Sequence, residues 1–203
     1  MEGNSNVGAV VLAAGSSSRM GIPKQTLQFK GNTLIRRAAL AALDAGCRPV
    51  VVVTGAHAEL CRREFDGLDV REAFNQDWQT GMASSVRAGI DALVTMDPDV
   101  AATVLLLCDQ PHVTSDVLAR LIAAHHATHK PVIASVYSGN SGVPALFSRT
   151  LFAELTKLEG TSGAKEVIKR HASEAHFLQF PEGEIDVDTP DDFASLIAPE
   201  RRE

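Results

Sequence analysis

The sequence has few aromatic residues and no long apolar run. Phe, Tyr and Trp make up 5% of its 203 residues, so the core must be built mainly from Ala, Val, Leu and Ile. Small aliphatic cores suit helices packed on a parallel sheet. The apolar stretch at 101–108 is too short to cross a bilayer, and the first dozen residues lack a basic run followed by an apolar one. We therefore expect neither a membrane segment nor a signal peptide.

Cysteine and basic charge are also scarce. The three cysteines, Cys47, Cys61 and Cys108, are odd in number and match no zinc spacing, which favours a reducing cytoplasmic location. The net charge is −6 and no basic stripe is present, so we expect no nucleic-acid partner. The length fits one domain at 7–198, flanked by loose tails at 1–6 and 199–203.

Short apolar runs alternate with helical stretches along the whole chain. This alternation predicts right-handed crossovers and a single-domain, Rossmann-like, doubly wound α/β fold, with helices on both faces of a mostly parallel sheet. The expected strands are 7–13, 49–54, 68–73, 103–108, 131–137, 143–147 and 175–180. The expected helices are 33–45, 57–65, 82–93, 114–128, 148–158, 162–171 and 190–197.

In such sheets, ligands bind beyond the carboxyl ends of the strands. The loop after the first strand, residues 12–24, is rich in small residues and carries Arg19 and Lys24. Small residues let backbone N–H groups approach phosphate oxygens, and the two cations add charge to that cradle. The loop matches neither the P-loop nor the dinucleotide pattern, and the alternative is a plain solvated turn.

Acidic residues follow the fourth strand and precede the last helix. Asp109 directly follows the 103–108 strand, where a carboxylate can hold Mg²⁺ together with phosphate oxygens. Asp186 and Asp188 alternate on an extended segment, so both point to one side. Asp109 could alternatively be a turn acid before Pro111. The alternative role of Asp188 is a cap for the helix that begins with Pro190.

A third candidate segment spans 75–89, where Gly81 and the start of a helix offer free N–H groups. The alternative is a glycine cap with buried serines. His125, His126 and His129 lie late on one helix without a completing acid, and we interpret them as a surface cluster at its C-terminus.

These motifs together resemble the MobA-like nucleotidyltransferases, whose signature loop reads L-A-A-G-x-S-x-R-M-G-x-x-K, as at 12–24 here. The resemblance runs from Val7 to Ile197 and implies a nucleotide-diphospho-sugar transferase type of fold. It assigns catalytic roles to Arg19, Lys24 and Asp109 and metal binding to Asp109, Asp188 and Asp186, with Asp188 favoured as the direct ligand. The nucleotide-binding set that it implies is Leu12, Ala13, Ala14, Gly15, Arg19, Lys24, Thr54, Gly55, Gly81 and Ser85.

The later motifs imply the acceptor side, formed by Gly142, Pro144, Gly163 and Lys165. Thr161 stands where the family more often has Asp, so this chain departs from the family pattern on the acceptor side. The chain is most similar to the molybdenum-cofactor cytidylyltransferases, because the guanylyl-transferring members typically have Gly-Gly where this chain has Ala14-Gly15. Methylerythritol-phosphate cytidylyltransferases share Arg-Met-Gly and Pro-Lys-Gln but usually continue strand four with Asp-Ala-Ala-Arg.

The resemblance therefore predicts Mg²⁺-dependent transfer of a cytidylyl group from CTP to the phosphate of molybdopterin, with release of pyrophosphate. A molybdoenzyme or its maturation chaperone is an expected partner. The alternatives are cytidylyl or guanylyl transfer to another small phosphorylated acceptor, and a non-catalytic cofactor-binding chaperone. An oxidoreductase is a third class, which the absence of a dinucleotide glycine pattern disfavours.

Overall fold

The computed structural model describes residues 6–198, so the two expected tails lie almost entirely outside it. Its centre is a seven-stranded sheet in the order β5-β4-β1-β6-β8-β7-β9. All neighbouring strands are parallel except β8, which runs antiparallel to both β6 and β7. The predicted α/β class with a mostly parallel sheet is confirmed. The strands are β1 Val7–Leu12, β4 Val50–Thr54, β5 Arg71–Phe74, β6 Ala102–Leu107, β7 Val132–Tyr137, β8 Asn140–Ser148 and β9 Ala175–Gln179.

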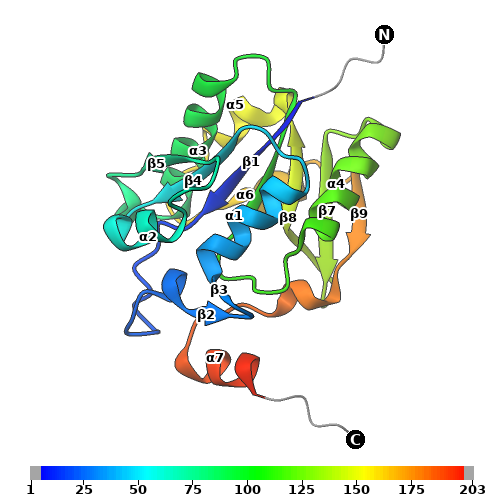
Figure 1. Ribbon diagram of the computed structural model, residues 1–203. Helices are drawn as coiled ribbons and strands as arrows, with labels where there is room; N and C mark the ends of the chain where they lie inside the picture. The colour runs from blue at the N-terminus through cyan, green and yellow to red at the C-terminus, as the bar shows by residue number, and fades with distance from the viewer. Residues whose placement is uncertain (1–5, 199–203) are drawn as a thin grey trace, which may run out of the picture.

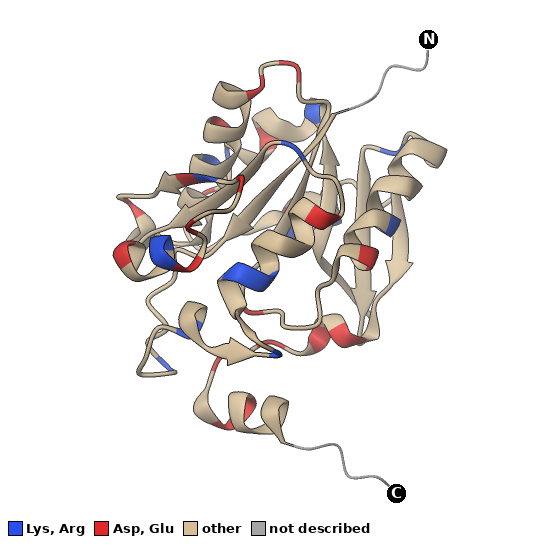
Figure 2. Cartoon of the chain, viewed as in Figure 1, with Lys and Arg blue, Asp and Glu red and all other residues tan. Residues whose placement is uncertain are grey.

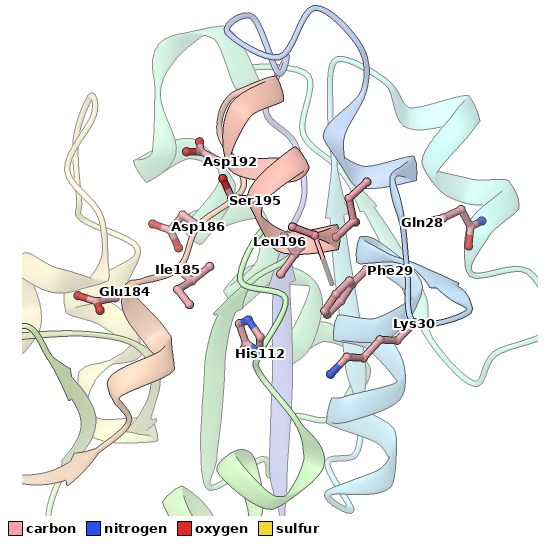
Figure 3. Close-up of a pocket in the computed structure, with 12 residues that line it drawn as sticks. Gln28, Phe29, Lys30, His112, Glu184, Ile185, Asp186, Asp192, Ser195 and Leu196 are labelled. Carbon is pink, nitrogen blue, oxygen red and sulfur yellow. The ribbon is translucent and has the colours of Figure 1, made fainter. Parts of the chain in front are cut away.

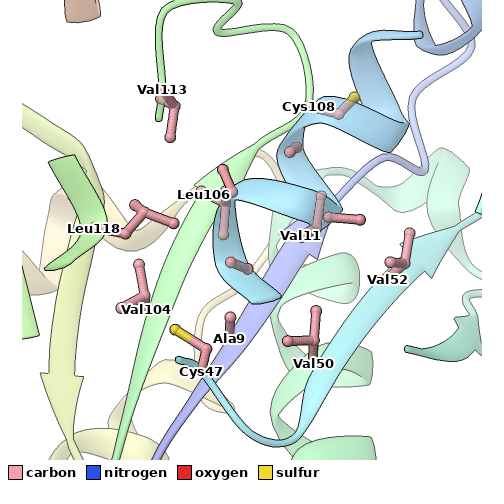
Figure 4. Packing of buried hydrophobic residues seen from close by; sticks show 14 of the residues in the cluster. Ala9, Val11, Cys47, Val50, Val52, Val104, Leu106, Cys108, Val113 and Leu118 are labelled. Atoms are coloured by element: carbon pink, nitrogen blue, oxygen red, sulfur yellow. The ribbon is translucent and has the colours of Figure 1, made fainter. Parts of the chain in front are cut away.

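Helices cover both faces of this sheet (Figure 1). One face carries α1 Leu34–Asp44, α2 Ala58–Glu64 and α4 Ser115–Thr128, and the other carries α3 Met82–Met96, α5 Phe152–Leu155 and α6 Ala164–Arg170. Alternate strand residues point to opposite faces. Ala9 and Val11 of β1 therefore join the first cluster, as Figure 4 shows, while Val10 and Leu12 join the second.

The last helix, α7 Pro190–Ile197, lies apart from these two layers, beside a small hairpin of β2 Gln28–Phe29 and β3 Asn32–Thr33 (Figure 1). Thr189 and Asp192 form a capping box at its start, which satisfies free N–H groups of the first turn. Phe193 and Leu196 pack on a small third cluster that includes Phe29. This arrangement anchors the acidic segment before α7.

The two hairpin turns are absent from the sequence prediction. Lys30 and Gly31 join β2 to β3, and Ser138 and Gly139 join β7 to β8; all four have positive φ. Two consecutive residues of this kind make the tight turn that suits a two-residue hairpin loop. The second hairpin explains why the predicted strand at 143–147 extends over Asn140–Ser148.

Several other predicted boundaries also differ, and α3 continues to Met96 where the expected helix ended at 93. The helix expected at 148–158 begins later, because Ser148 still pairs with Ala102 in the sheet, and it consists of a 3-10 turn at Arg149–Leu151 followed by α5. The strand expected at 68–73 begins at Arg71, because the Val70 N–H donates to Leu68 in a local turn. The three cysteines are free and buried, and within residues 6–198 no helix has the length and apolarity to cross a membrane.

The contact between α3 and β1 yields a first prediction. A Cβ added at Gly89 would lie 2.3 Å from Cγ1 of the fully buried Val10. The gain in helix propensity for Gly89→Ala is about 1 kcal/mol, whereas overpacking costs about 1–3 kcal/mol. We expect a net loss of free energy of unfolding in urea titrations.

Asp91→Ala, an exposed position on the same helix, serves as the control and should stay within about 0.5 kcal/mol of the parent. Equal stability of the Gly89 variant and the parent would show that this contact relaxes freely.

Candidate functional site

A cavity of about 550 Å³ opens at the carboxyl ends of β1 and β6. Most of its wall comes from the loop after β1, the start of α3 and the residues that follow β6. It lies at the edge of the sheet where the sequence predicted a ligand. The predicted site residues that line it are Leu12, Ala13, Ala14, Gly15, Arg19, Lys24, Gly81, Ser85, Asp109, Asp186 and Asp188.

Gln25 holds the loop after β1 in shape. Its side chain is 1% exposed and its Nε2 donates to the carbonyls of Ala13, at 3.1 Å, and Gly15, at 2.7 Å. The Ser17 hydroxyl donates to Gln25 Oε1 and accepts the N–H of Lys24. Because these bonds fix the carbonyls on the inner side, the loop is organised before any ligand arrives.

Lys24 lies at the centre of the charged groups in the cavity. Its Nζ is 2.5 Å from Asp109 Oδ2 and 2.8 Å from Asp188 Oδ1. Burial opposes the charge on Lys24, but Asp109 and Asp188 outweigh that effect and raise its pKa. Arg19, whose side chain is 69% exposed, adds a second contact to Asp188 at 2.8 Å.

Asp188 is correspondingly held as a carboxylate. Burial alone opposes its ionisation, but the hydrogen bond and charge of Lys24, followed by Arg19, lower its pKa. Because the loop and the acidic segment carry opposite charges, each stabilises the ionised form of the other.

The fold brings the distant carboxylates together through the backbone. The Val187 N–H donates to the Asp109 carbonyl at 3.0 Å, and the Val187 side chain is fully buried in the cluster around Phe29. Asp186 and Asp188 flank this buried residue and both line the cavity. The expectation that they share one side therefore matches their positions.

The donor set fits a hard divalent cation. Asp109 Oδ1 is buried and has no hydrogen-bond partner within residues 6–198, so one lone-pair-bearing oxygen is left for a ligand. Burial, followed by repulsion from Asp109 and Asp188, raises the pKa of Asp186 to about 7, so a nearby cation would favour its ionised form. In the described part of the chain, no group of three His, Cys, Asp or Glu side chains holds a metal unaided. Mg²⁺ in phosphate-transfer sites takes one or two carboxylates and completes its shell with phosphate and water.

Two predicted nucleotide-binding residues lie behind the cavity wall. Thr54 is fully buried and its hydroxyl donates to Glu72 Oε1 at 2.6 Å. A Cβ at Gly55 would approach the Ala14 carbonyl to 2.6 Å and Trp78 Cβ to 2.8 Å. Neither residue lines the cavity, and Gly55 instead permits the close contact between the loop and Trp78.

A second cavity of about 410 Å³ adjoins the first, sharing Leu12, Met82 and Leu107 with it. Gly142, Gly163 and Lys165 from the predicted acceptor set line it, together with Tyr137 and Thr161. Pro144 does not line it, because it is buried in the sheet and its carbonyl accepts the Ser135 hydroxyl. Three of the four predicted acceptor residues thus share one wall.

A third and larger cavity of about 890 Å³, shown in Figure 3, lies between α7, the small hairpin and His112. It shares Asp186 with the first cavity. Phe29 and Lys30 form one side, and Glu184 and Asp186 lie on the other (Figure 3). This cavity was not predicted, because two of its walls are the hairpin and α7, and how these two elements pack against each other is not encoded in a local sequence pattern.

Several residues of the first cavity were not singled out from the sequence as site residues. They are Ser16, Gln25, Trp78, Gln79, Met82, Leu107 and Cys108. Gln25 belongs to the Pro-Lys-Gln stretch, Ser16 lies in the loop at 12–24, and Trp78, Gln79 and Met82 lie in the candidate segment at 75–89. Burial, followed by the charge of Asp109, raises the pKa of the Cys108 thiol well above its usual range, so Cys108 is an inert wall residue.

Outside the cavity, positively and negatively charged side chains are interspersed. In Figure 2, Lys and Arg positions on this face are scattered among Asp and Glu without forming a stripe. His126 and His129 are exposed, and His125 bonds the Lys130 carbonyl, as expected for a surface cluster.

Comparisons with known proteins agree with this geometry. Residues 9–175 match the family described as the MobA-like NTP transferase domain. This match spans most of the chain, and the chain belongs to that nucleotidyltransferase family.

Individual relatives have different names. The chain is 38% identical to nicotine blue oxidoreductase of Paenarthrobacter nicotinovorans over 120 residues. These matched residues make up 59% of this chain and 57% of that protein. It is 26% identical to the molybdenum cofactor cytidylyltransferase of Escherichia coli strain K12, over 97% of both chains.

Among solved structures, Rv0371c of Mycobacterium tuberculosis H37Rv is similar with a TM-score of 0.78 and 31% identity, covering 95% of this chain and 97% of that one. A complex of that protein with manganese matches with a TM-score of 0.74 and 30% identity, covering 95% and 98%. These likenesses confirm the fold class.

The Gln25 side chain yields a second prediction. Gln25→Leu leaves two carbonyls and the Ser17 hydroxyl without their partner, and a buried unpaired polar group costs about 1–3 kcal/mol. We expect the free energy of unfolding measured in urea to fall by that amount. We also expect trypsin to cleave faster after the exposed Arg19.

Gln28→Leu is the matched control, because Gln28 is exposed on the neighbouring strand, and it should change neither property appreciably. Parent-like cleavage of the Gln25 variant would mean that the loop keeps its shape without the clamp.

Proposed function

We propose that the protein transfers a cytidylyl group from CTP to the terminal phosphate of molybdopterin and that it requires Mg²⁺. The observation that carries this proposal is the meeting of Lys24, Asp109 and Asp188 in one cavity with the small-residue loop. A cation next to carboxylates, beside a loop of small residues that lets a ligand approach the backbone, suits a triphosphate with its metal. The family membership supports the transfer chemistry, and the cytidylyltransferase relative supports CTP and the acceptor.

Asp109 and Asp188 are the proposed metal ligands, with Asp186 as a further carboxylate beside them. A bound divalent ion supplies Lewis acidity and charge neutralisation on the triphosphate. The Oδ1 of Asp109 is the proposed contact atom, because no protein group within the described residues uses it.

The side chains of the loop handle the remaining charge. The acceptor phosphate attacks the α-phosphorus, the new P–O bond forms, and the bond to the β-phosphate oxygen breaks as pyrophosphate leaves. Lys24 and Arg19 stabilise negative charge that develops on the departing oxygens. A phosphate monoester is already anionic near pH 7, so the reaction needs no general base, and the residues act by positioning and charge.

The base and acceptor sides are proposed from the two adjoining cavities. Ala13 to Gly15, Gly81 and Ser85 surround the base end, and Gly142, Gly163 and Lys165 line the acceptor end. Ala14 in place of a second glycine favours CTP over GTP. The buried thiols fit the cytoplasm, and a molybdoenzyme or its chaperone is the proposed recipient of the product.

A third prediction tests the catalytic assignments. Lys24→Ala and Asp109→Ala should each lower turnover by about two orders of magnitude or more, since removing one transition-state contact costs about 10²–10³-fold in rate. The circular dichroism spectrum should stay unchanged. Near-parental turnover of either variant would remove that residue from the mechanism.

A fourth prediction concerns the nucleotide. With Mg²⁺, CTP at a hundred times its dissociation constant should stabilise the protein by about 2.7 kcal/mol. GTP, ATP and UTP at the same concentration should shift the melting temperature less. Equal shifts for all four would contradict the preference for CTP.

Two alternative functions predict different experimental results. The 38% identity to nicotine blue oxidoreductase favours reduction as the second candidate, and consumption of NADPH with a dye substrate is its test. The loop lacks the glycine pattern that cradles a dinucleotide. A chaperone that only holds the cofactor would bind molybdopterin without pyrophosphate release.

A further inference from the structure

A buried amide connects the nucleotide cavity to the segment before α3. Asn75 is 4% exposed, and its Nδ2 donates to Ser84 Oγ at 2.8 Å and to Ser85 Oγ at 3.0 Å. Asn75 Oδ1 accepts the N–H of Asp77 at 3.0 Å. Since a backbone N–H can only donate, it fixes which end of the amide faces the serines.

The two serines differ in what their own hydrogens can reach. The Ser84 hydroxyl lies 3.0 Å from the Asp77 carbonyl and 2.8 Å from the Gly81 carbonyl, so its hydrogen has an acceptor. The Ser85 hydroxyl accepts from Asn75 and has no acceptor of its own within residues 6–198. Of these two serines, Ser85 is the one that lines the cavity, beside Gly81, Met82 and Trp78.

We propose that Asn75 is a positioning residue that turns the Ser85 hydroxyl into a hydrogen-bond donor toward an acceptor atom of the nucleobase. This inference rests on the proposed function, because it needs the base of the nucleotide at the α3 end of the cavity. Asn75 itself touches no ligand. The atom that Ser85 meets is a carbonyl oxygen or an unprotonated ring nitrogen, and an amino group there would leave the hydroxyl hydrogen unpaired.

The substitution Asn75→Asp tests this directly. The introduced carboxylate is nearly isosteric and still accepts the Asp77 N–H, but it accepts from the serine hydroxyls instead of donating to them. The Ser85 hydrogen then turns away from the cavity. The binding of CTP with Mg²⁺ can be followed by tryptophan fluorescence, because Trp78 is the one tryptophan of the chain and lines the same cavity.

We expect Asn75→Asp and Ser85→Ala each to raise the Kd for CTP by about two- to tenfold, the range of one neutral hydrogen bond. The Kd of the double variant should exceed that of Ser85→Ala alone by no more than about twofold, because Asn75 acts through Ser85. KM should rise in all three while kcat changes less. Asn140→Asp makes the same charge change at the exposed first residue of β8 and should leave the Kd unaltered.

Ser84→Ala removes the other bond of the same amide and should lower stability with little change in Kd. If Asn75→Asp fails to fold, Asn75→Ala takes its place in the cycle with the same expected non-additivity. Losses of affinity that multiply in the double variant would overturn the positioning role. An absence of any fluorescence change with CTP and Mg²⁺ in the parent protein would instead overturn the proposed function, and this inference with it.

Discussion

The ion pairs of Lys24 with Asp109 and Asp188 are the interaction on which the rest of this site depends. They join three segments that are distant in sequence: the loop after β1, the end of β6 and the stretch before α7. Neither the lysine ammonium nor the aspartate carboxylates would be stable as unpaired ions in a partly buried cavity, because an uncompensated charge there costs free energy. The pairing therefore keeps a cation and two anions at the carboxyl ends of the strands. A metal-bound triphosphate complements this arrangement of charges.

The fold supplies this arrangement through ordinary constraints. Parallel strands end at one edge, so the residues after β1 and β6 are neighbours by construction. The acidic stretch reaches the same edge because Val187 is buried and its N–H bonds the Asp109 carbonyl. Gln25 and Asn75 then act alike, each a buried amide that orients a segment of the wall from behind.

Much of this was predictable from sequence. The apolar runs located the main strands, and the position of Asp109 after a buried strand placed it in the crevice. The contact of Lys24 with Asp188 depends on how α7 docks, and no periodicity encodes that docking. The hairpin turns at Lys30–Gly31 and Ser138–Gly139 escaped prediction because their non-glycine residues adopt positive φ, which only a tight turn requires. The roles of Thr54 and Gly55 behind the wall likewise follow from packing, which a motif does not reveal.

Nucleotidyl transfer in this cavity can be followed by incubating the protein with molybdopterin, Mg²⁺ and CTP labelled either at the α- or at the γ-phosphorus. We expect the α-label to appear in the pterin product and the γ-label in pyrophosphate, in equal amounts. Recovery of both labels in unchanged CTP, or of the γ-label as free phosphate alone, would contradict nucleotidyl transfer.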